Sequence, residues 1–417
     1  MHGVSSSGDG VGRMPDGRTA FVPWTLPDEE VRVRVVESRK RWVRAVPEDL
    51  VRPAMGRVEP PCPHFGTCGG CRLQHMPEGE QRRWKGVFVR EALSRIGGLP
   101  LDEDVPVAPS AEQFGYRSRV TFTVAHRGGR LHAGLKEAGR PGRVVDIDRC
   151  LLADPAIQET WTGLRQLLQK AGTIPPGTVA RVTLRAVEEG VIMLWTPRCP
   201  APDGEFFAQL PGMIQVWESG ASGSRRLWGD TEGHETWFGR RVKVPGPAFT
   251  QVNRASGQRL FDAVVEAAGD VEGLKVVDAY GGLSPVGTEL ADQGGSVTVV
   301  EMDERATASL AEDGGVAVLW GRVEALLPEA LPADLVILNP PRSGLHEETV
   351  VHLLAEPPAR ILYVSCDPAT LARDVKRLSL RYEMGRVHAF DLFPQTPHVE
   401  VLVDLRVRDP DIGQAAE

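Results

Sequence analysis

The stretch "VVDAYGGLSPVGTELA", residues 276–291, decides the fold of the C-terminal half of the chain. The apolar run "SVTVVEM" follows it and reaches Glu301, 23 residues after Asp278. Glycines directly after a strand let a ligand approach the backbone at the carboxyl edge of a sheet. An acid at the end of the next strand can accept hydrogen bonds from ribose hydroxyls. The pattern indicates either a site for a nucleoside-bearing ligand or a plain strand-to-helix turn.

Apolar strands and helices alternate around this turn, over residues 248–409. The strands are "LKVVDAY", "SVTVVEM", "ADLVILN" and "RILYVSC", and the helices include "QRLFDAVVEAAG", "EETVVHLLAE" and "PATLARDVKRLSL". Buried strands that alternate with helices predict a doubly wound parallel α/β sheet. The strand "VEVLVDLRV" is expected to close the sheet, and residues 410–417 are expected to form a tail.

The first 247 residues have a different character. Short alternating segments such as "RTAFVPW" and "EEVRVRVVES" predict a small β-barrel of the oligonucleotide-binding kind over residues 1–57. Segments such as "RVTFTVAHRGGRLHAGL" predict a mainly antiparallel central domain over 58–247. A helix is expected near 80–98, where it can pack on the C-terminal domain.

Composition limits the classes of protein. No run of 18 apolar residues occurs and "MHGVSSSGDG" lacks the features of a signal peptide, so we expect a cytoplasmic protein without a membrane span. The net charge of −8 argues against nucleic-acid binding only weakly, because local charge matters more than the sum. Basic residues gather around Trp42, at Arg32, Arg34, Arg39, Lys40, Arg41, Arg44 and Arg52. They fit either an RNA-binding surface or a solvated strand face.

Cys366 lies where the strand "RILYVSC" stops. Asp367 is a good N-cap and Pro368 suits the first helical position. The positive end of the helix dipole would favour the nucleophilic thiolate form of Cys366. An inert core thiol is the alternative, although a position at the ligand edge of the sheet favours function.

Two further loops reach the same edge. In "NPPRSGL", Asn339 offers both an acceptor and donors, and Arg342 can contact phosphate or simply hold the loop. "FPQTPHVEV" brings Glu400 to the last strand, with His398 two residues before it. From the spacing alone, a surface carboxylate and a structural histidine are the simpler interpretations.

The segment "CPHFGTCGGCRLQH", residues 62–75, gathers Cys62, Cys68 and Cys71. Clustered thiols in a reducing compartment bind metal more often than they form disulfides. Residue types alone leave two sites equally open: an iron–sulfur cluster, or zinc held by four thiolates or by three with His64 or His75. Cys199 is interpreted as a structural thiol.

Together these segments resemble the RNA uracil-5-methyltransferase family. The resemblance runs through "FTQVN" (249–253), "DAYGG" (278–282), "NPPRSGL" (339–345), "SCDPATLARD" (365–374) and "PQTPHVE" (394–400). The N-terminal barrel resembles the TRAM domain of that family, and the cysteine segment resembles the iron–sulfur motif of its ribosomal-RNA branch. The resemblance implies an S-adenosylmethionine-dependent enzyme that binds RNA, expected to be 23S ribosomal RNA, and we expect a monomer.

The resemblance also assigns roles to residues. It implies that Cys366 is a nucleophile that adds to carbon 6 of uracil and that Glu400 is the proton acceptor at carbon 5. The expected cofactor contacts are Gln251, Tyr280, Gly282, Glu301 and Asn339. The expected 4Fe–4S ligands are Cys62, Cys68, Cys71 and, as the fourth thiolate, Cys150. The target base must be flipped out or single-stranded.

Three positions depart from the family pattern. Asn339 stands where Asp is usual, which leaves cytosine as a second candidate base. Ser284 and Pro285 change the glycine turn, and Gly281 replaces a cysteine. The competing hypotheses are a transfer-RNA methyltransferase, an RNA-binding protein with impaired cofactor binding, and an iron–sulfur redox enzyme, for which the sequence offers no flavin site.

Overall fold

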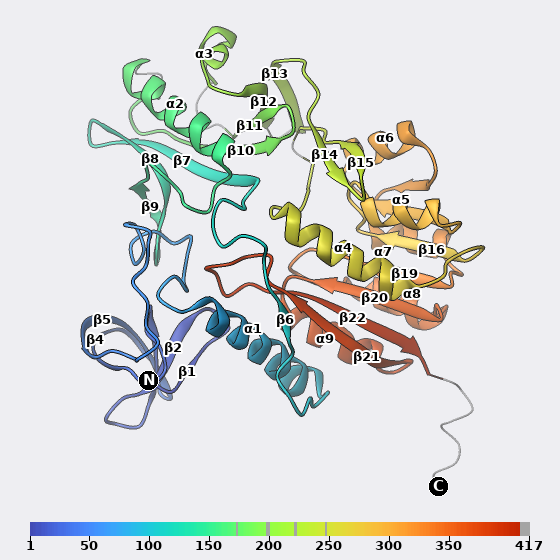
Figure 1. Cartoon of the computed structure of the whole chain (residues 1–417), viewed down its shortest axis with the longest axis horizontal. Coiled ribbons are helices and arrows are strands. Elements are labelled where there is room, and N and C mark those ends of the chain that lie inside the picture. The colour runs from blue at the N-terminus through green and yellow to red at the C-terminus, as the bar shows by residue number, and fades with distance from the viewer. Residues whose placement is uncertain (172–173, 197–200, 221–222, 247, 409–417) are drawn as a thin grey trace.

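The computed structural model describes residues 1–171, 174–196, 201–220, 223–246 and 248–408. The tail expected at 410–417 and Cys199 lie outside these ranges. The described residues form three large sheets, one N-terminal, one central and one C-terminal, and a two-stranded hairpin (Figure 1).

The N-terminal sheet has five strands within residues 1–57, in the order β1-β2-β3-β5-β4. They are β1 (Gly3–Val4), β2 (Asp9–Arg13), β3 (Thr19–Pro23), β4 (Glu30–Ser38) and β5 (Trp42–Arg52). Alternate residues of β3 are buried, as a half-exposed strand requires. Ala20, Val22, Val43 and Ala45 form its small core.

The central sheet has the order β13-β12-β11-β10-β7-β8-β9, and only β11 and β12 pair in parallel. Its strands are β7 (Arg119–Arg127), β8 (Arg130–Glu137), β9 (Arg140–Asp146), β10 (Val179–Val187), β11 (Gly190–Thr196), β12 (Met213–Gly220) and β13 (Gly223–Trp228). One face is covered by α2 (Pro155–Ala171), a helix that the sequence analysis did not predict, and Phe122 stacks on Trp161 at 3.8 Å between ring centroids. Helix α3 (Gly204–Ala208) and the hairpin of β14 (His234–Trp237) and β15 (Arg240–Lys243) complete this part.

The C-terminal sheet has eight strands in the order β18-β17-β16-β19-β20-β22-β21-β6. These are β16 (Lys275–Ala279), β17 (Ser296–Glu301), β18 (Ala317–Trp320), β19 (Leu335–Leu338), β20 (Arg360–Ser365), β21 (Tyr382–Phe390), β22 (Glu400–Val407) and β6 (Val107–Ala108). β16 to β20 are parallel, as predicted, whereas β22 runs antiparallel to both neighbours. The fold is therefore the predicted doubly wound α/β sheet, closed by antiparallel β22, with a separate N-terminal β domain.

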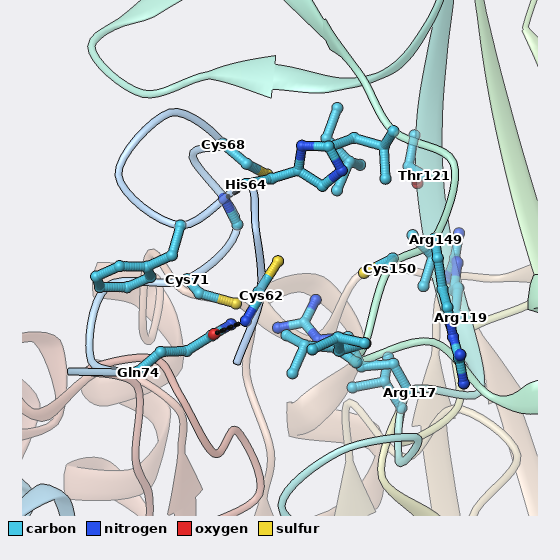
Figure 2. Close-up of a pocket in the computed structure, with 18 residues that line it drawn as sticks. Cys62, His64, Cys68, Cys71, Gln74, Arg117, Arg119, Thr121, Arg149 and Cys150 are labelled. Carbon is cyan, nitrogen blue, oxygen red and sulfur yellow. Dashed lines mark hydrogen bonds between the residues drawn. The ribbon is translucent and has the colours of Figure 1, made fainter. Parts of the chain in front are cut away.

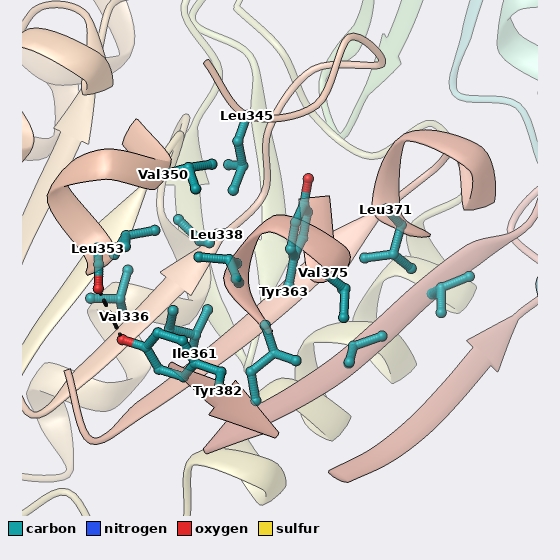
Figure 3. Close-up of a cluster of buried hydrophobic side chains, with 14 of the residues drawn as sticks. Val336, Leu338, Leu345, Val350, Leu353, Ile361, Tyr363, Leu371, Val375 and Tyr382 are labelled. Atoms are coloured by element: carbon teal, nitrogen blue, oxygen red, sulfur yellow. Dashed lines mark hydrogen bonds between the residues drawn. The ribbon is translucent and has the colours of Figure 1, made fainter. Parts of the chain in front are cut away.

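Helices cover both faces of this sheet (Figure 1). One face carries α4 (Arg254–Ala268), α5 (Pro285–Asp292) and α6 (Glu304–Asp313); the other carries α7 (Val323–Ala330), α8 (Glu347–Ala355) and α9 (Pro368–Leu378). Figure 3 shows the core on the second face, where Tyr363 and Tyr382 lie among aliphatic side chains and the Tyr382 hydroxyl donates to the Leu353 carbonyl.

Helix α1 (Glu78–Ala92) and its π-helical extension (Leu93–Gly97) pack on the C-terminal sheet, although they precede it by a whole domain. Val89 and Leu93 belong to the same core as Tyr363, and β6 adds to the sheet edge beside β21. None of the helices in the described ranges combines the length and hydropathy needed to cross a bilayer.

Candidate functional site

The carboxyl ends of the parallel strands open into a cavity of about 940 Å³. Its wall contains every residue to which the sequence analysis assigned a catalytic or cofactor role: Gln251, Tyr280, Gly282, Glu301, Asn339, Cys366 and Glu400. Tyr280, Gly282, Glu301, Asn339 and Cys366 come together because each ends or follows a parallel strand of one sheet. Glu400 begins the antiparallel strand β22 at the same edge, and Gln251 precedes α4. The structure thus unites in one cavity residues that are up to 149 positions apart in sequence.

Cys366 lies between β20 and α9 and is half-buried. Asp367 caps α9 by accepting from the amides of Ala369 and Thr370, both at 2.9 Å, as predicted. Burial nevertheless raises the pKa of Cys366 to about 11, and the neighbouring Glu400 adds to the rise. Burial therefore opposes the thiolate form that the N-terminus of α9 was expected to favour.

Glu400 begins β22 and is 4% exposed. Burial raises its pKa to about 8, and the charge of Arg342 acts in the opposite direction. A carboxyl group whose pKa lies near neutral pH suits general acid–base catalysis. The interpretation of Glu400 as an exposed surface carboxylate, which the spacing alone favoured, is wrong.

Arg342 interacts with both groups. Its charge and a hydrogen bond lower the pKa of Cys366, and its charge lowers that of Glu400. The sequence left open whether Arg342 holds phosphate or the loop; the structure places it beside the two ionisable groups instead. Arg117, from the central domain, also lines the cavity and lies 5.9 Å above the Phe393 ring. No local sequence pattern points to Arg117.

The cofactor end of the cavity is built on the glycine turn. Glu301 accepts hydrogen bonds from the amides of Gly282 (2.9 Å), Met302 (2.7 Å) and Asp303 (2.8 Å), which fix its carboxylate at the strand end. Tyr280 has a φ of 61° and Gly282 a φ of 60°, so the chain bends sharply at the ligand edge. A fixed acid beside a tight glycine turn fits a ribose-bearing ligand.

His398 packs with its ring edge toward Phe393, at 6.0 Å between centroids. Burial, together with the charges of Arg342, Arg117 and Lys85, lowers its pKa to about 4, so the ring is neutral at physiological pH. This agrees with the interpretation of His398 as a structural residue.

The four predicted metal ligands line a second cavity of about 350 Å³ (Figure 2). Cys62, Cys68 and Cys71 come from the loop before α1, and Cys150 faces them from the segment before α2. Burial raises the pKa of Cys68 to about 11 and that of Cys71 to about 12. Within the described ranges, no group of three or more His, Cys, Asp or Glu side chains adopts an arrangement that could hold a metal ion.

The two histidines considered as zinc ligands are separated. His64 lines the cysteine cavity, whereas His75 is fully buried against Phe65 at 5.4 Å between ring centroids. Arg117 lines both the cysteine cavity and the cavity that contains Cys366 and Glu400, so the two cavities share a wall.

The basic run on β4 and β5 is partly neutralised. Arg32, Arg34 and Arg39 pair with Asp49, Glu48 and Glu37 on the surface. The guanidinium of Arg44 lies 5.8 Å above the Trp42 ring, and Trp42 packs edge-on against Phe21. Lys40 and Arg41 are exposed at the turn between β4 and β5.

Comparisons with known proteins agree with this arrangement. The tRNA (uracil-5-)-methyltransferase family model matches residues 320–408, and the TRAM domain model matches residues 2–47. An uncharacterized RNA methyltransferase of Nitratidesulfovibrio vulgaris is 31% identical over 95% of this chain and 93% of its own. One from Streptomyces avermitilis is 32% identical over 96% of each chain.

A solved structure is similar over nearly the whole length. The tRNA (uracil-54, C5)-methyltransferase of Pyrococcus abyssi, in complex with S-adenosyl-L-homocysteine, has a TM-score of 0.74 and 28% identity, and the match covers 97% of this chain and 99% of that one. With its sheet, its TRAM domain and its relatives taken together, the chain belongs to the S-adenosylmethionine-dependent RNA (uracil-5-)-methyltransferase family.

Proposed function

We propose that this enzyme methylates carbon 5 of a uridine in RNA through a covalent bond between Cys366 and carbon 6 of the base. The observation that carries the proposal is the shared cavity: Cys366 and Glu400 line the same space as the glycine turn and Glu301. A nucleophile, a base and a cofactor wall within one cavity satisfy the geometric requirement for such a reaction.

Cys366 performs the first step. Carbon 5 of uracil is a weak nucleophile, so the Cys366 thiolate adds to carbon 6 and the electron pair of the ring double bond moves toward carbon 5. Arg342 supports this step, because it lowers the pKa of the thiol that burial raises.

Glu400 performs the last step. Its carboxylate takes the proton from carbon 5, the electron pair of that bond restores the ring double bond, and the Cys366–carbon 6 bond breaks. Gln251, Tyr280, Gly282 and Glu301 would hold S-adenosylmethionine, which would supply the electrophilic methyl group to carbon 5 and leave as S-adenosylhomocysteine. The fit rests on the fixed Glu301 carboxylate beside the tight turn.

Asn339 bears on the choice of base. Its amide can accept from the ring N–H of uracil and donate to a carbonyl, and it lines the cavity with Cys366. We therefore assign uracil as the target base. A methylated cytosine product would instead assign recognition of cytosine to Asn339.

The cysteine cavity supports an iron–sulfur cluster as the resident group. Its four thiols line one space on the order of ten times the volume of a water molecule, but the structure does not group them as metal ligands, so a bound cluster would have to draw them together. Cys62, Cys68, Cys71 and Cys150 would hold it, with their protons displaced because the ligand form is the thiolate. Methyl transfer is polar, so we assign the cluster the role of joining the cysteine loop to the central domain.

Ribosomal RNA, specifically 23S, is the substrate we propose, because the cysteine segment resembles the ribosomal-RNA branch of the family. Transfer RNA is the second candidate, favoured by the likeness to the Pyrococcus abyssi enzyme. We place the enzyme in the cytoplasm as a monomer, where both RNAs and reduced thiols occur.

Mapping 5-methyluridine in total RNA from a deletion strain tests the assignment. We expect one or more 23S positions to lose the modification and a plasmid copy to restore it. Loss confined to transfer RNA would replace the ribosomal assignment, and unchanged RNA together with no calorimetric binding of S-adenosylmethionine would favour an RNA-binding protein without activity.

A further inference from the structure

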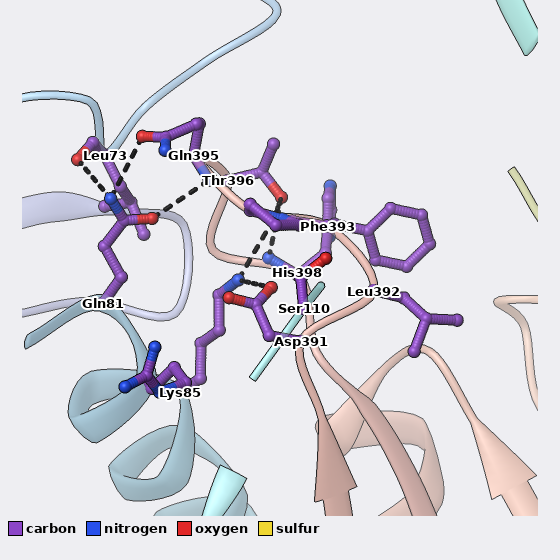
Figure 4. A network of polar contacts seen from close by, with 12 residues as sticks. Leu73, Gln81, Lys85, Ser110, Asp391, Leu392, Phe393, Gln395, Thr396 and His398 are labelled. Carbon is purple, nitrogen blue, oxygen red and sulfur yellow. Dashed lines mark hydrogen bonds and ion pairs between the residues drawn. The ribbon is translucent and has the colours of Figure 1, made fainter. Parts of the chain in front are cut away.

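The loop of residues 391–396, between β21 and β22, is held by hydrogen bonds from outside the C-terminal domain (Figure 4). Lys85 on α1 donates to the Asp391 carboxylate at 2.5 Å and to the Phe393 carbonyl at 3.1 Å, with both charged side chains fully buried. The Tyr116 hydroxyl donates to the Pro394 carbonyl at 2.9 Å. Consecutive carbonyls of one loop thus take donors from different segments.

Gln395 is the centre of this arrangement. Its amide donates to the side-chain oxygen of Gln81 at 3.0 Å, and its own side-chain oxygen accepts from Gln81 at 3.1 Å. Its carbonyl accepts from the amides of Arg72 (3.0 Å) and Leu73 (3.1 Å), next to Cys71 in the chain. The residue is 5% exposed and has a φ of 69°, a left-handed conformation that a non-glycine residue adopts only when its surroundings impose it.

The side chain of Gln81 is likewise fixed by several hydrogen bonds. It is 2% exposed on α1, and its amide nitrogen also donates to the carbonyls of Leu73 (3.1 Å) and Met76 (2.9 Å). One side chain therefore joins the end of the cysteine loop, the start of α1 and the loop before β22. These contacts fix the position of Gln395 relative to the helix and to the cysteine loop.

The loop leads directly into the reaction cavity. Phe393 lines the cavity, and Glu400 begins β22 five residues after Gln395. We propose that Gln81 and Gln395 are positioning residues that hold Glu400 in register for removal of the carbon 5 proton. This inference rests on the proposed function, because it concerns the last step of that reaction.

The test compares Gln395→Gly and Gln81→Leu with the wild type and with Glu400→Gln. Glycine accepts the φ of residue 395, so Gln395→Gly removes the side-chain contacts without adding backbone strain. Because only the last step should slow, we expect turnover to fall about 10- to 100-fold. Covalent enzyme–RNA adduct should accumulate on denaturing gels, and the calorimetric affinity for S-adenosylmethionine should stay within about twofold of wild type.

Gln215→Leu is the matched control. Gln215 is 4% exposed and hydrogen-bonds the Thr231 carbonyl and the Trp217 indole within the central domain, away from this loop. The Gln215→Leu variant should have lower thermal stability than the wild type but should not accumulate the covalent enzyme–RNA adduct. Adduct no higher in Gln395→Gly and Gln81→Leu than in Gln215→Leu, or a parallel loss of cofactor affinity, would overturn the inference. Failure of Glu400→Gln itself to accumulate adduct would count against the proposed function instead.

Discussion

Ser284 illustrates how one residue compensates for a departure from a family pattern. It has a φ of 45°, and its buried hydroxyl donates to the Asp278 carboxylate at 2.5 Å. Burial raises the pKa of Asp278 to about 6, and this hydrogen bond lowers it. Ser284 therefore strains the backbone where the family pattern has a glycine, but its hydroxyl supplies a hydrogen bond to a buried carboxyl group.

Substitution of Ser284 separates these two effects. Ser284→Ala should lower the free energy of unfolding by about 2 kcal/mol, because the Asp278 carboxyl group loses a partner. Ser284→Gly loses the same hydroxyl but relieves the left-handed strain, so it should be more stable than Ser284→Ala by about 1 kcal/mol. Urea unfolding measures both values. An alanine variant as stable as the wild type would show that the hydrogen bond from Ser284 to Asp278 does not stabilise the folded protein.

Glu400 should make the stability of the protein depend on pH. Its pKa is raised from 4.5 to about 8, so the folded state keeps a proton that the unfolded state releases between these values. The free energy of unfolding should therefore decrease as pH rises from about 4.5 to about 8. Glu400→Gln cannot titrate there, so its stability relative to wild type should increase with pH. Urea unfolding at pH 5 and pH 8.5 checks this, and parallel changes in the two proteins would contradict it.

At the scale of elements, apolar periodicity and capping residues predicted individual helices and the residues where they begin. Leu260, Val264 and Ala268 form the buried stripe of α4, and Asp367 with Pro368 starts α9 as predicted. The docking of α1 on the C-terminal domain matches the expectation for the helix near 80–98. The pairing of β6 with β21 was not predicted, because a contact between distant segments leaves no period in the local sequence.

The same reasoning separates the predicted from the unpredicted parts of the site. Glu301, Asn339 and Cys366 were expected to meet because the carboxyl ends of parallel strands share one edge. Arg117 reaches the site from the central domain, and Gln81 on α1 contacts the loop that leads into it. Their place depends on how the domains dock, so no motif identified them.

The junction between α1 and the β21–β22 loop contains a buried ion pair, Lys85 with Asp391. Breaking one partner leaves an uncompensated buried charge, so Lys85→Met should lower the free energy of unfolding by about 3–5 kcal/mol. The double variant Lys85→Met/Asp391→Leu should recover most of this loss, because both charges are then removed. Urea unfolding of the wild type, Lys85→Met, Asp391→Leu and the double variant tests the pair, and additive losses would contradict the interpretation.

At the scale of the whole molecule, the cysteine cavity lies where the N-terminal loop, the central sheet and the C-terminal domain meet. Cys62→Ser should lower the iron content of protein purified without oxygen and weaken RNA binding. Binding of S-adenosylmethionine should change less than about twofold, because the cofactor residues belong to the C-terminal sheet. Metal analysis, an RNA binding assay and calorimetry provide the three values. Unchanged fold and RNA affinity with abolished methyl transfer would contradict a structural role for the cluster.

The charge distribution also acts on this scale. The chain carries a net charge of −8, yet the residues that face the proposed RNA site include Arg117 and Arg342. Local positive charge within an acidic protein can still attract a phosphate backbone. The sum of charges therefore does not decide whether such a chain binds RNA.

The most direct test is the covalent bond between the protein and RNA. Target RNA is incubated with S-adenosylmethionine and either Glu400→Gln or Cys366→Ala, and the products are separated on a denaturing gel. The account predicts a protein–RNA adduct with Glu400→Gln, because release requires proton removal, and none with Cys366→Ala. Equal adduct with both variants, or none with Glu400→Gln on an RNA that the wild type methylates, would contradict it.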